Sequence, residues 1–145
     1  MPEWSPEARA FLERHRVGHL ATAGADGAPH VVPVCYALDA TALYFVADEK
    51  PKRGPAHRLQ RLVNLRANPR AALVVDDYDD DWTRLAWLLV RGPAHVVTAP
   101  STHARALALL RTRYPQYLTM SLDDGERNPI VRIEPERVRL WRAAG

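Results

Sequence analysis

Three strand-like segments follow one another near the start of the chain, with connections too short to hold a helix. They cover residues 17–23, 30–37 and 42–46, and each is rich in Val, Ala, Leu or aromatic residues. The first connection, at 24–27, has glycine at both ends, as a hairpin turn favours. Because parallel strands need a long crossover, these segments predict an antiparallel meander and exclude a doubly wound α/β fold.

Short helices and further strands are predicted along the rest of the chain. A cap and a proline at Ser5-Pro6 begin the first helix, the apolar spacing at 59–63 indicates a second that ends near Asn68-Pro69, and Pro100 begins a third. The third helix is predicted to face inward with Ala104, Leu107, Leu110 and Tyr114. The further strands are predicted at 71–75, at 85–97 with a kink at Gly92-Pro93, at 130–133 and at 138–141.

The length of 145 residues predicts a single domain, 1–145. The composition, 47% hydrophobic and 26% charged, is that of a globular protein. The predicted elements make its fold class mainly β with short helices (α+β). Six or seven short antiparallel strands are best closed into a barrel, which removes exposed edges. Pro33 cannot donate to a strand ladder, so it marks a sheet edge or a bulge. The sequence has no long apolar run and no start like that of a signal peptide, so we expect a cytoplasmic protein with no membrane partner. Cys35 is the single cysteine, which excludes an internal disulfide.

Motifs of common catalytic sites are missing from the sequence. We find no GxSxG, Walker A, HExxH, paired CxxC or GxGxxG pattern, and the six histidines are scattered, so no metal site is predicted. The acidic run 76–81 lacks the glycine of a calcium loop and indicates a solvated hairpin tip. The net charge is only +3 with acids interspersed, which does not favour nucleic acid. Trp82, Trp87 and Trp141 are interpreted as core or interface residues.

A basic segment after the third predicted strand is the strongest candidate for ligand binding. Its cations are Lys50, Lys52, Arg53, Arg58 and Arg61. Five positive charges in so short a stretch, beside the sheet edge marked by Pro33, can hold a phosphate at the mouth of a barrel. The alternative is a basic loop and a helix face that are simply solvated.

Several short segments, in this order and spacing, give the sequence its resemblance to a known family. They are 18–22, 27–34, 43–45, 64–70 and 90–94. Together they resemble the pyridoxamine 5'-phosphate oxidase-like (PPOX class) superfamily of split β-barrel flavin and deazaflavin oxidoreductases, over roughly residues 11–141. Segment 48–52 with segment 81–85 is similar to the subgroup that depends on coenzyme F420, an 8-hydroxy-5-deazaflavin.

The resemblance implies a fold, an assembly and a site. The implied fold is a six- to seven-stranded antiparallel split β-barrel like that of FMN-binding proteins, and the implied assembly is a homodimer with two cofactor sites at the subunit interface. Backbone groups at Val32, Pro33 and Val34 would face the cofactor ring, and the basic residues after the third strand would hold its phosphate. The residues implied for phosphate are Lys50, Lys52 and Arg61, with Asn64 beside them, and those for the interface wall are Trp87 and Trp141. Many relatives carry a lysine where this chain has Arg61.

The resemblance also implies why catalytic motifs are missing. The cofactor ring would carry the hydride, so the chain needs no catalytic side chain of its own. We therefore expect an F420-dependent oxidoreductase that transfers hydride to or from a small organic substrate. The alternatives are an FMN-dependent oxidase or reductase of the same fold, a non-catalytic flavin or deazaflavin carrier, and a small barrel that binds nucleic acid, although the strands lack the aromatic and basic residues that the last requires.

Overall fold

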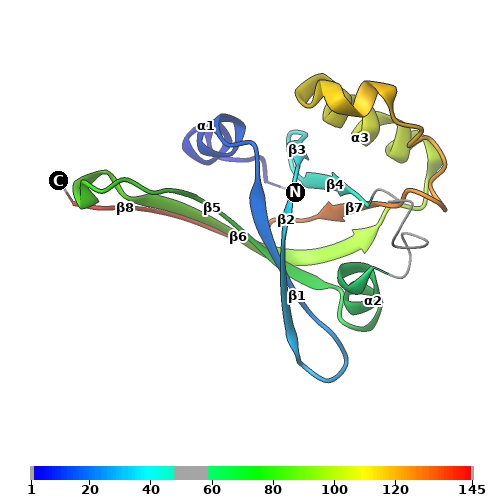
Figure 1. Ribbon diagram of the computed structural model, residues 1–145, viewed down its shortest axis with the longest axis horizontal. Coiled ribbons are helices and arrows are strands. Elements are labelled where there is room, and N and C mark those ends of the chain that lie inside the picture. The colour runs from blue at the N-terminus through cyan, green and yellow to red at the C-terminus, as the bar shows by residue number, and fades with distance from the viewer. Residues whose placement is uncertain (1, 48–58, 145) are drawn as a thin grey trace.

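Eight antiparallel strands form one curled sheet in the computed structural model, which describes residues 2–47 and 59–144 (Figure 1). The strands are β1 (Gly18–Ala23), β2 (Pro29–Val34), β3 (Ala37–Leu38), β4 (Leu43–Val46), β5 (Arg70–Asp77), β6 (Ala86–Val96), β7 (Ile130–Ile133) and β8 (Arg137–Arg142). Their order is β2-β1-β5-β6-β7-β4-β3, with β8 pairing β6 off this path. The predicted antiparallel split barrel is confirmed, and the two-residue strand β3 raises the strand count above the expected six or seven.

Three α-helices cover different parts of this sheet. They are α1 (Pro6–Arg14), α2 (Gln60–Ala67) and α3 (Pro100–Arg113), and short 3₁₀ turns lie at Trp82–Arg84 and Pro115–Thr119. Ser5 caps α1 as predicted, accepting a hydrogen bond from the Ala8 N–H at 3.2 Å. In Figure 1, α3 lies beside β3, β4 and β7, whereas β5, β6 and β8 extend away from it as a long arm.

Strand β6 joins the arm to the rest of the barrel. One edge of β6 pairs with β5 from Ala86 to Pro93, while the other edge pairs first with β8 and then with β7. The change occurs at the predicted kink, where the Glu134 N–H donates to the Pro93 carbonyl and the Glu136 N–H donates to the Arg91 carbonyl, both at 2.9 Å. A Cβ atom at Gly92 would overlap the Glu134 carbonyl oxygen, so only glycine can occupy this position in β6.

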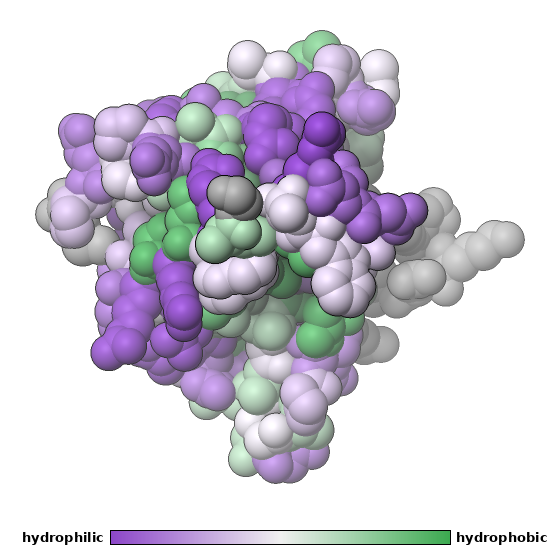
Figure 2. All heavy atoms as spheres, turned by 90° about the vertical axis from the view of Figure 1, so that its left-hand side faces the viewer, coloured by the Kyte–Doolittle hydropathy of each residue, from purple (hydrophilic) through white to green (hydrophobic). Residues whose placement is uncertain are grey.

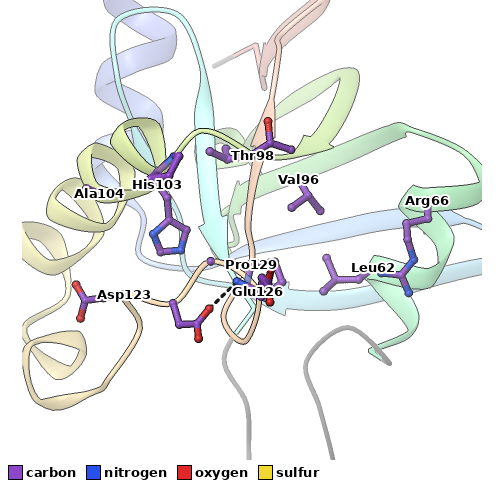
Figure 3. A pocket seen from close by; sticks show the side chains of 13 residues that line it. Leu62, Arg66, Val96, Thr98, His103, Ala104, Asp123, Glu126 and Pro129 are labelled. Carbon is purple, nitrogen blue, oxygen red and sulfur yellow. Dashed lines mark hydrogen bonds between the residues drawn. The ribbon is translucent and has the colours of Figure 1, made fainter.

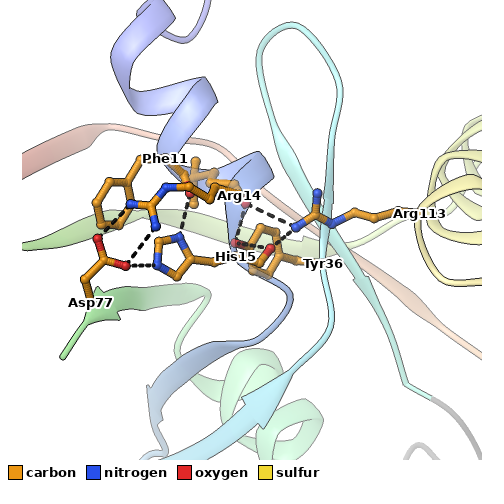
Figure 4. Close-up of polar contacts among 7 residues, drawn as sticks. Phe11, Arg14, His15, Tyr36, Asp77 and Arg113 are labelled. Atoms are coloured by element: carbon orange, nitrogen blue, oxygen red, sulfur yellow. Dashed lines mark hydrogen bonds and ion pairs between the residues drawn. The ribbon is translucent and has the colours of Figure 1, made fainter. Parts of the chain in front are cut away.

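The predicted meander of three neighbouring strands is wrong at its second connection. Strand β2 ends at Val34, and β4 pairs with β3 and β7 rather than with β2. Tyr36 causes this break: it is fully buried, its hydroxyl donates to the Leu12 carbonyl at 2.6 Å, and its N–H donates to the Tyr114 hydroxyl at 3.0 Å (Figure 4). Because of these bonds, the backbone leaves the β1–β2 ladder before it begins to pair in β3. Burial also raises the pKa of the Tyr36 hydroxyl far above its usual value.

Two apolar clusters fill the fold. The larger lies inside the curl of the sheet and includes Phe11 and Leu12 of α1 with Leu20, Leu73 and Leu88 of the strands. The smaller lies under α3 and contains Ala106, Leu107 and Leu110 of that helix, and His103 is buried on the same helix. The prediction that Ala104 faces inward is wrong, because the buried face of α3 is rotated toward His103 and leaves Ala104 exposed.

Candidate functional site

The strand predicted to face a cofactor ring is β2, an edge strand of the sheet. Among the described strands it pairs with β1 alone, so the backbone groups on its other side have no strand partner. Pro33 lies exposed on β2, and the prediction that it marks an edge is confirmed. Val32 packs against the core and Val34 is buried. The backbone at 32–34 therefore lies at an open edge supported by the core from behind.

Asn64 is buried between α2 and β1. Its side-chain Nδ2 donates to the Thr22 hydroxyl at 3.1 Å, and its Oδ1 accepts from the Gln60 amide at 2.7 Å. A Cβ at Gly24 would approach Asn64 Oδ1 to 2.7 Å, so the glycine after β1 makes room for this amide. These contacts give Asn64 a positioning role, since it fixes the helix that carries Arg61 onto the strand beside β2.

His30 stands next to this amide and has an unsatisfied nitrogen. In the β1–β2 ladder His30 is directly opposite Thr22, so both side chains point to the same face of the sheet. His30 Nδ1 is buried, and no described residue hydrogen-bonds to it. A buried polar atom without a partner is costly, so this nitrogen is a ready hydrogen-bonding position for a bound group. His30 could not be selected from the sequence, because a lone histidine in a strand does not indicate a binding site.

One of the five predicted phosphate-binding cations lies in the described part of the chain. Arg61 is half-buried in the first turn of α2, three residues before Asn64 and therefore on the same side of the helix. Lys50, Lys52, Arg53 and Arg58 fall outside the described residues. These groups suit a planar, anionic cofactor. The open strand edge and the buried imidazole nitrogen can bind hydroxyl or amide groups of a ring, and the guanidinium can bind a phosphate, so the residues fit a flavin-type cofactor.

The two predicted interface residues lie on the outer face of the arm. The indole rings of Trp87 and Trp141 stack on opposite strands with centroids 6.1 Å apart, and the Arg139 guanidinium covers Trp87 at 5.4 Å. Val31 of β2, on the same outer face, is 64% exposed. Viewed from the end of the arm, hydrophobic surface is visible between hydrophilic side chains (Figure 2).

A shallow groove with three arginines crosses the same outer face. Its volume is about 490 Å³. Arg70, Arg91 and Arg137 line it above a floor of alanines from β1 and β5, and Arg70 pairs with Glu136 at 2.8 Å. That bond from Arg70 holds the pKa of the Glu136 carboxyl below its usual value. These arginines were not predicted as site residues, although the alternation of arginine with apolar residues in β8 indicates a strand with one charged face.

The structure does not bring all the predicted site residues into one cavity. Asn64 contacts the inner face of β1 through Thr22, whereas Trp87 and Trp141 are on the outer face of the same sheet. Side chains on opposite faces of a strand cannot line one pocket within a single subunit. The two predicted groups can meet only if a second copy contributes the tryptophans.

The described residues contain neither a group of possible metal ligands nor a membrane-spanning helix. Over 2–47 and 59–144, no three His, Cys, Asp or Glu side chains are grouped so that they could hold a metal ion. None of the helices in the same ranges is long and apolar enough to span a membrane.

Comparison with known proteins gives one family and several relatives. The family model described as pyridoxamine 5'-phosphate oxidase matches residues 4–142. A 5a,11a-dehydrotetracycline/5a,11a-dehydrooxytetracycline reductase of Streptomyces rimosus is 30% identical over 145 residues, which cover 93% of this chain and 80% of the reductase.

Two solved structures are similar to this chain along most of its length. A conserved hypothetical protein of Mycobacterium tuberculosis superimposes with a TM-score of 0.75 at 26% identity, covering 97% of this chain and 86% of that one. A FAD-binding protein of Mesorhizobium loti superimposes with a TM-score of 0.64, also at 26% identity, covering 93% of this chain and 92% of that one.

Proposed function

Because this chain belongs to the pyridoxamine 5'-phosphate oxidase family, we propose that it is an oxidoreductase that binds coenzyme F420 at the interface of a homodimer. The similarity to a dehydrotetracycline reductase supports reductase chemistry. The choice of F420 rests on the subgroup resemblance of segments 48–52 and 81–85. FMN is the second candidate, and the similarity to a FAD-binding protein favours it.

One observation carries this proposal more than any other. The buried Nδ1 of His30 has no partner among the described residues, and it lies beside the open edge of β2 where the family resemblance puts the cofactor. Thr22 and Asn64 fix α2 against this position, and Arg61 supplies the positive charge for a phosphate. Lys50, Lys52, Arg53 and Arg58 remain predicted phosphate ligands.

The residues of this chain bind and orient rather than react. A deazaflavin or flavin ring, when bound, supplies the hydride, and in this proposal no protein nucleophile is needed. The core packing behind Val32 and Val34 keeps the strand edge rigid, which fixes one face of the ring against the wall. The outer-face tryptophans of a second copy would exclude water from the opposite side. The substrate we propose is a small organic molecule with a conjugated, electron-poor double bond.

Titration of the purified protein with F420 and with FMN, followed by cofactor fluorescence, tests the proposal. We expect F420 to bind in the micromolar range and FMN to bind at least about tenfold more weakly, a difference of about 1.4 kcal/mol. If FMN alone binds, the FMN alternative replaces the F420 proposal. If neither cofactor binds, the proposed function is wrong.

A pair of arginine variants tests the site itself. Arg61→Gln should weaken cofactor binding about 10- to 100-fold, because a charge-assisted hydrogen bond contributes about 1.5–3 kcal/mol. Arg105→Gln, at an exposed position of α3, is the control and should leave affinity unchanged. Equal affinities of the two variants would remove Arg61 from the site and assign the phosphate to the other predicted cations.

A further inference from the structure

A second cavity, larger than the groove on the outer face, opens between α2, α3 and the segment 123–129 (Figure 3). Its volume is about 910 Å³, which is within the range of cavities that bind drug-sized molecules. The end of β6 and the start of β7 form one wall, where the Val97 N–H donates to the Ile130 carbonyl at 2.8 Å. Elements tied by backbone hydrogen bonds give this cavity a fixed shape.

Helix α2 separates this cavity from the candidate cofactor site. Leu62 and Arg66 line the cavity and are four residues apart, so they share one side of the helix. Asn64 lies midway between them and points to the opposite side, toward Thr22 of β1. A ligand in the cavity would therefore not occupy the space beside β2.

The cavity combines an apolar wall with a buried hydrogen-bond acceptor. Val96 and Val97, which are partly exposed, provide the apolar surface, with the buried Leu62 and Pro129 behind them. His103 is only 5% exposed, and its ring points into the cavity in Figure 3. Its Nε2 lies 3.0 Å from the Asn128 carbonyl, which can only accept, so Nε2 carries the hydrogen. In the neutral ring Nδ1 is then an acceptor, and it has no hydrogen-bond partner within the described part of the chain.

Among the residues that the structure describes, the rim of the cavity carries more negative than positive charge. Asp123, Asp124 and Glu126 line it, and Arg66 is the one described cation beside them. Asp123 is partly neutralised by Arg111 at 3.3 Å, and Asp124 Oδ1 accepts from the Glu126 N–H at 2.9 Å. The carboxylates and the His103 acceptor all favour a ligand that donates hydrogen bonds and carries positive charge.

We propose that this cavity is a binding site for an apolar ring compound that bears a protonated amine. The ring would pack on the wall formed by Val96 and Val97, and the amine would lie between His103 and the carboxylates of 123–126. The site goes beyond the proposed oxidoreductase function and does not depend on which cofactor binds.

Two dansyl probes of opposite charge test the proposal on the intact protein. Dansylcadaverine ends in an ammonium group, whereas dansyl-6-aminohexanoate has the same fluorophore and ends in a carboxylate. With direct excitation of the dansyl group, we expect a blue-shifted emission for the first probe and an affinity at least about tenfold lower for the second. Equal affinities for the two probes, or no binding of either, would overturn the proposal.

Substitutions on α3 locate the bound probe. Ala104 is exposed and lines the cavity, so Ala104→Phe should fill the entrance and weaken dansylcadaverine binding by about tenfold or more. Ala108 is exposed one turn later on the helix and does not line the cavity, so Ala108→Phe is a matched control that should bind normally. If both variants bind alike, the probe is elsewhere and the site is rejected.

A charge reversal and a competition complete the test. Glu126→Lys should reduce the preference for the ammonium probe several-fold, because it removes a carboxylate and adds a competing cation. Saturating F420 or FMN should leave dansylcadaverine affinity unchanged. Displacement of the probe by either cofactor would assign the cavity to the cofactor site and overturn the proposal, whereas absence of cofactor binding alone would contradict only the proposed function.

Discussion

The two faces of the sheet formed by β1, β2, β5, β6 and β8 come from the same strands but serve different ends. On the inner face, Leu20, Leu73 and Leu88 are fully buried against the core. On the outer face, Val31 is 64% and Trp141 is 36% exposed. Helices of the same chain cover the inner face, and no described element covers the outer one. The inner face therefore stabilises the folded chain, and the outer face is open to association and ligand binding.

The largest effect is expected from the inner face. Leu88→Ala should lower the free energy of unfolding by about 2–5 kcal/mol, because it leaves a cavity in a fully packed core. Urea denaturation at low protein concentration measures this loss. Leu89→Ala changes the next residue, which faces outward and is half-buried, and should cost clearly less under the same conditions. A similar cost for both would show that the two faces do not differ in their contribution to folding.

The outer face should affect association instead. Trp87→Ala removes one half of the stacked Trp87–Trp141 pair, and we expect the dissociation constant of the proposed homodimer to rise by a factor that corresponds to about 2–4 kcal/mol. Sedimentation velocity across a concentration series measures this change. Leu118→Ala, an exposed apolar residue in the turn after α3, is the control. A wild-type protein that stays monomeric at all concentrations would reject the dimer.

Local signals predicted the elements, and distant contacts decided how they join. The cap at Ser5, the hairpin turn at 24–27 and the proline stop after α2 act within a few residues, so the sequence displays them directly. The break at Tyr36 depends on Tyr114, which is 78 residues away in the chain. No periodicity reports such a contact, and for that reason the meander was predicted one connection too long.

The residues of the candidate site also divide into those that local sequence reveals and those that depend on distant contacts. Arg61 and Asn64 could be selected because a charge and an amide at helical spacing are visible in the sequence. The orphan nitrogen of His30 is a property of burial, which depends on every element packed around it. Alternation along a strand shows that residues fall on two faces, but it does not tell which face the helices will cover. The tryptophans were therefore predicted for the site without knowledge that they face away from Asn64.

A smaller effect is expected at the bond that fixes α2 to the inner face. Thr22→Val keeps the side-chain volume but leaves the buried Nδ2 of Asn64 without its acceptor, at a cost of about 1–3 kcal/mol in the free energy of unfolding. Thr112→Val, at an exposed position of α3, is the control and should change stability by less than about 0.5 kcal/mol. Urea denaturation compares the two. A loss no greater than that of the control would mean that the Asn64 bond does not hold the helix in place.

The smallest effect should come from an ion pair at the margin between the faces, where α1 meets the arm (Figure 4). Arg14 donates two hydrogen bonds to Asp77, at 3.0 and 2.7 Å, and these hold the pKa of the Asp77 carboxyl below its usual value. A carboxyl whose pKa is lower in the folded state stabilises the protein above the unfolded pKa of about 4, and this contribution is lost as the pH falls through the folded pKa. Because both side chains are partly exposed, Asp77→Asn should cost only about 0.5–1 kcal/mol at pH 7.

Urea denaturation at pH 7 and at pH 3 measures this dependence. The stability difference between wild type and the Asp77→Asn variant should be full at pH 7 and smaller at pH 3, where part of the wild-type carboxyl is protonated. Arg14→Gln should reproduce only part of the loss, because Asp77 Oδ1 also lies 2.7 Å from His15 Nε2. Combining the two substitutions should cost less than their sum, because both remove the Arg14–Asp77 bonds. A difference that stays constant between the two pH values would assign the effect to packing of α1 rather than to charge. Such a result would mean that the margin of the sheet is held in the same way as its inner face.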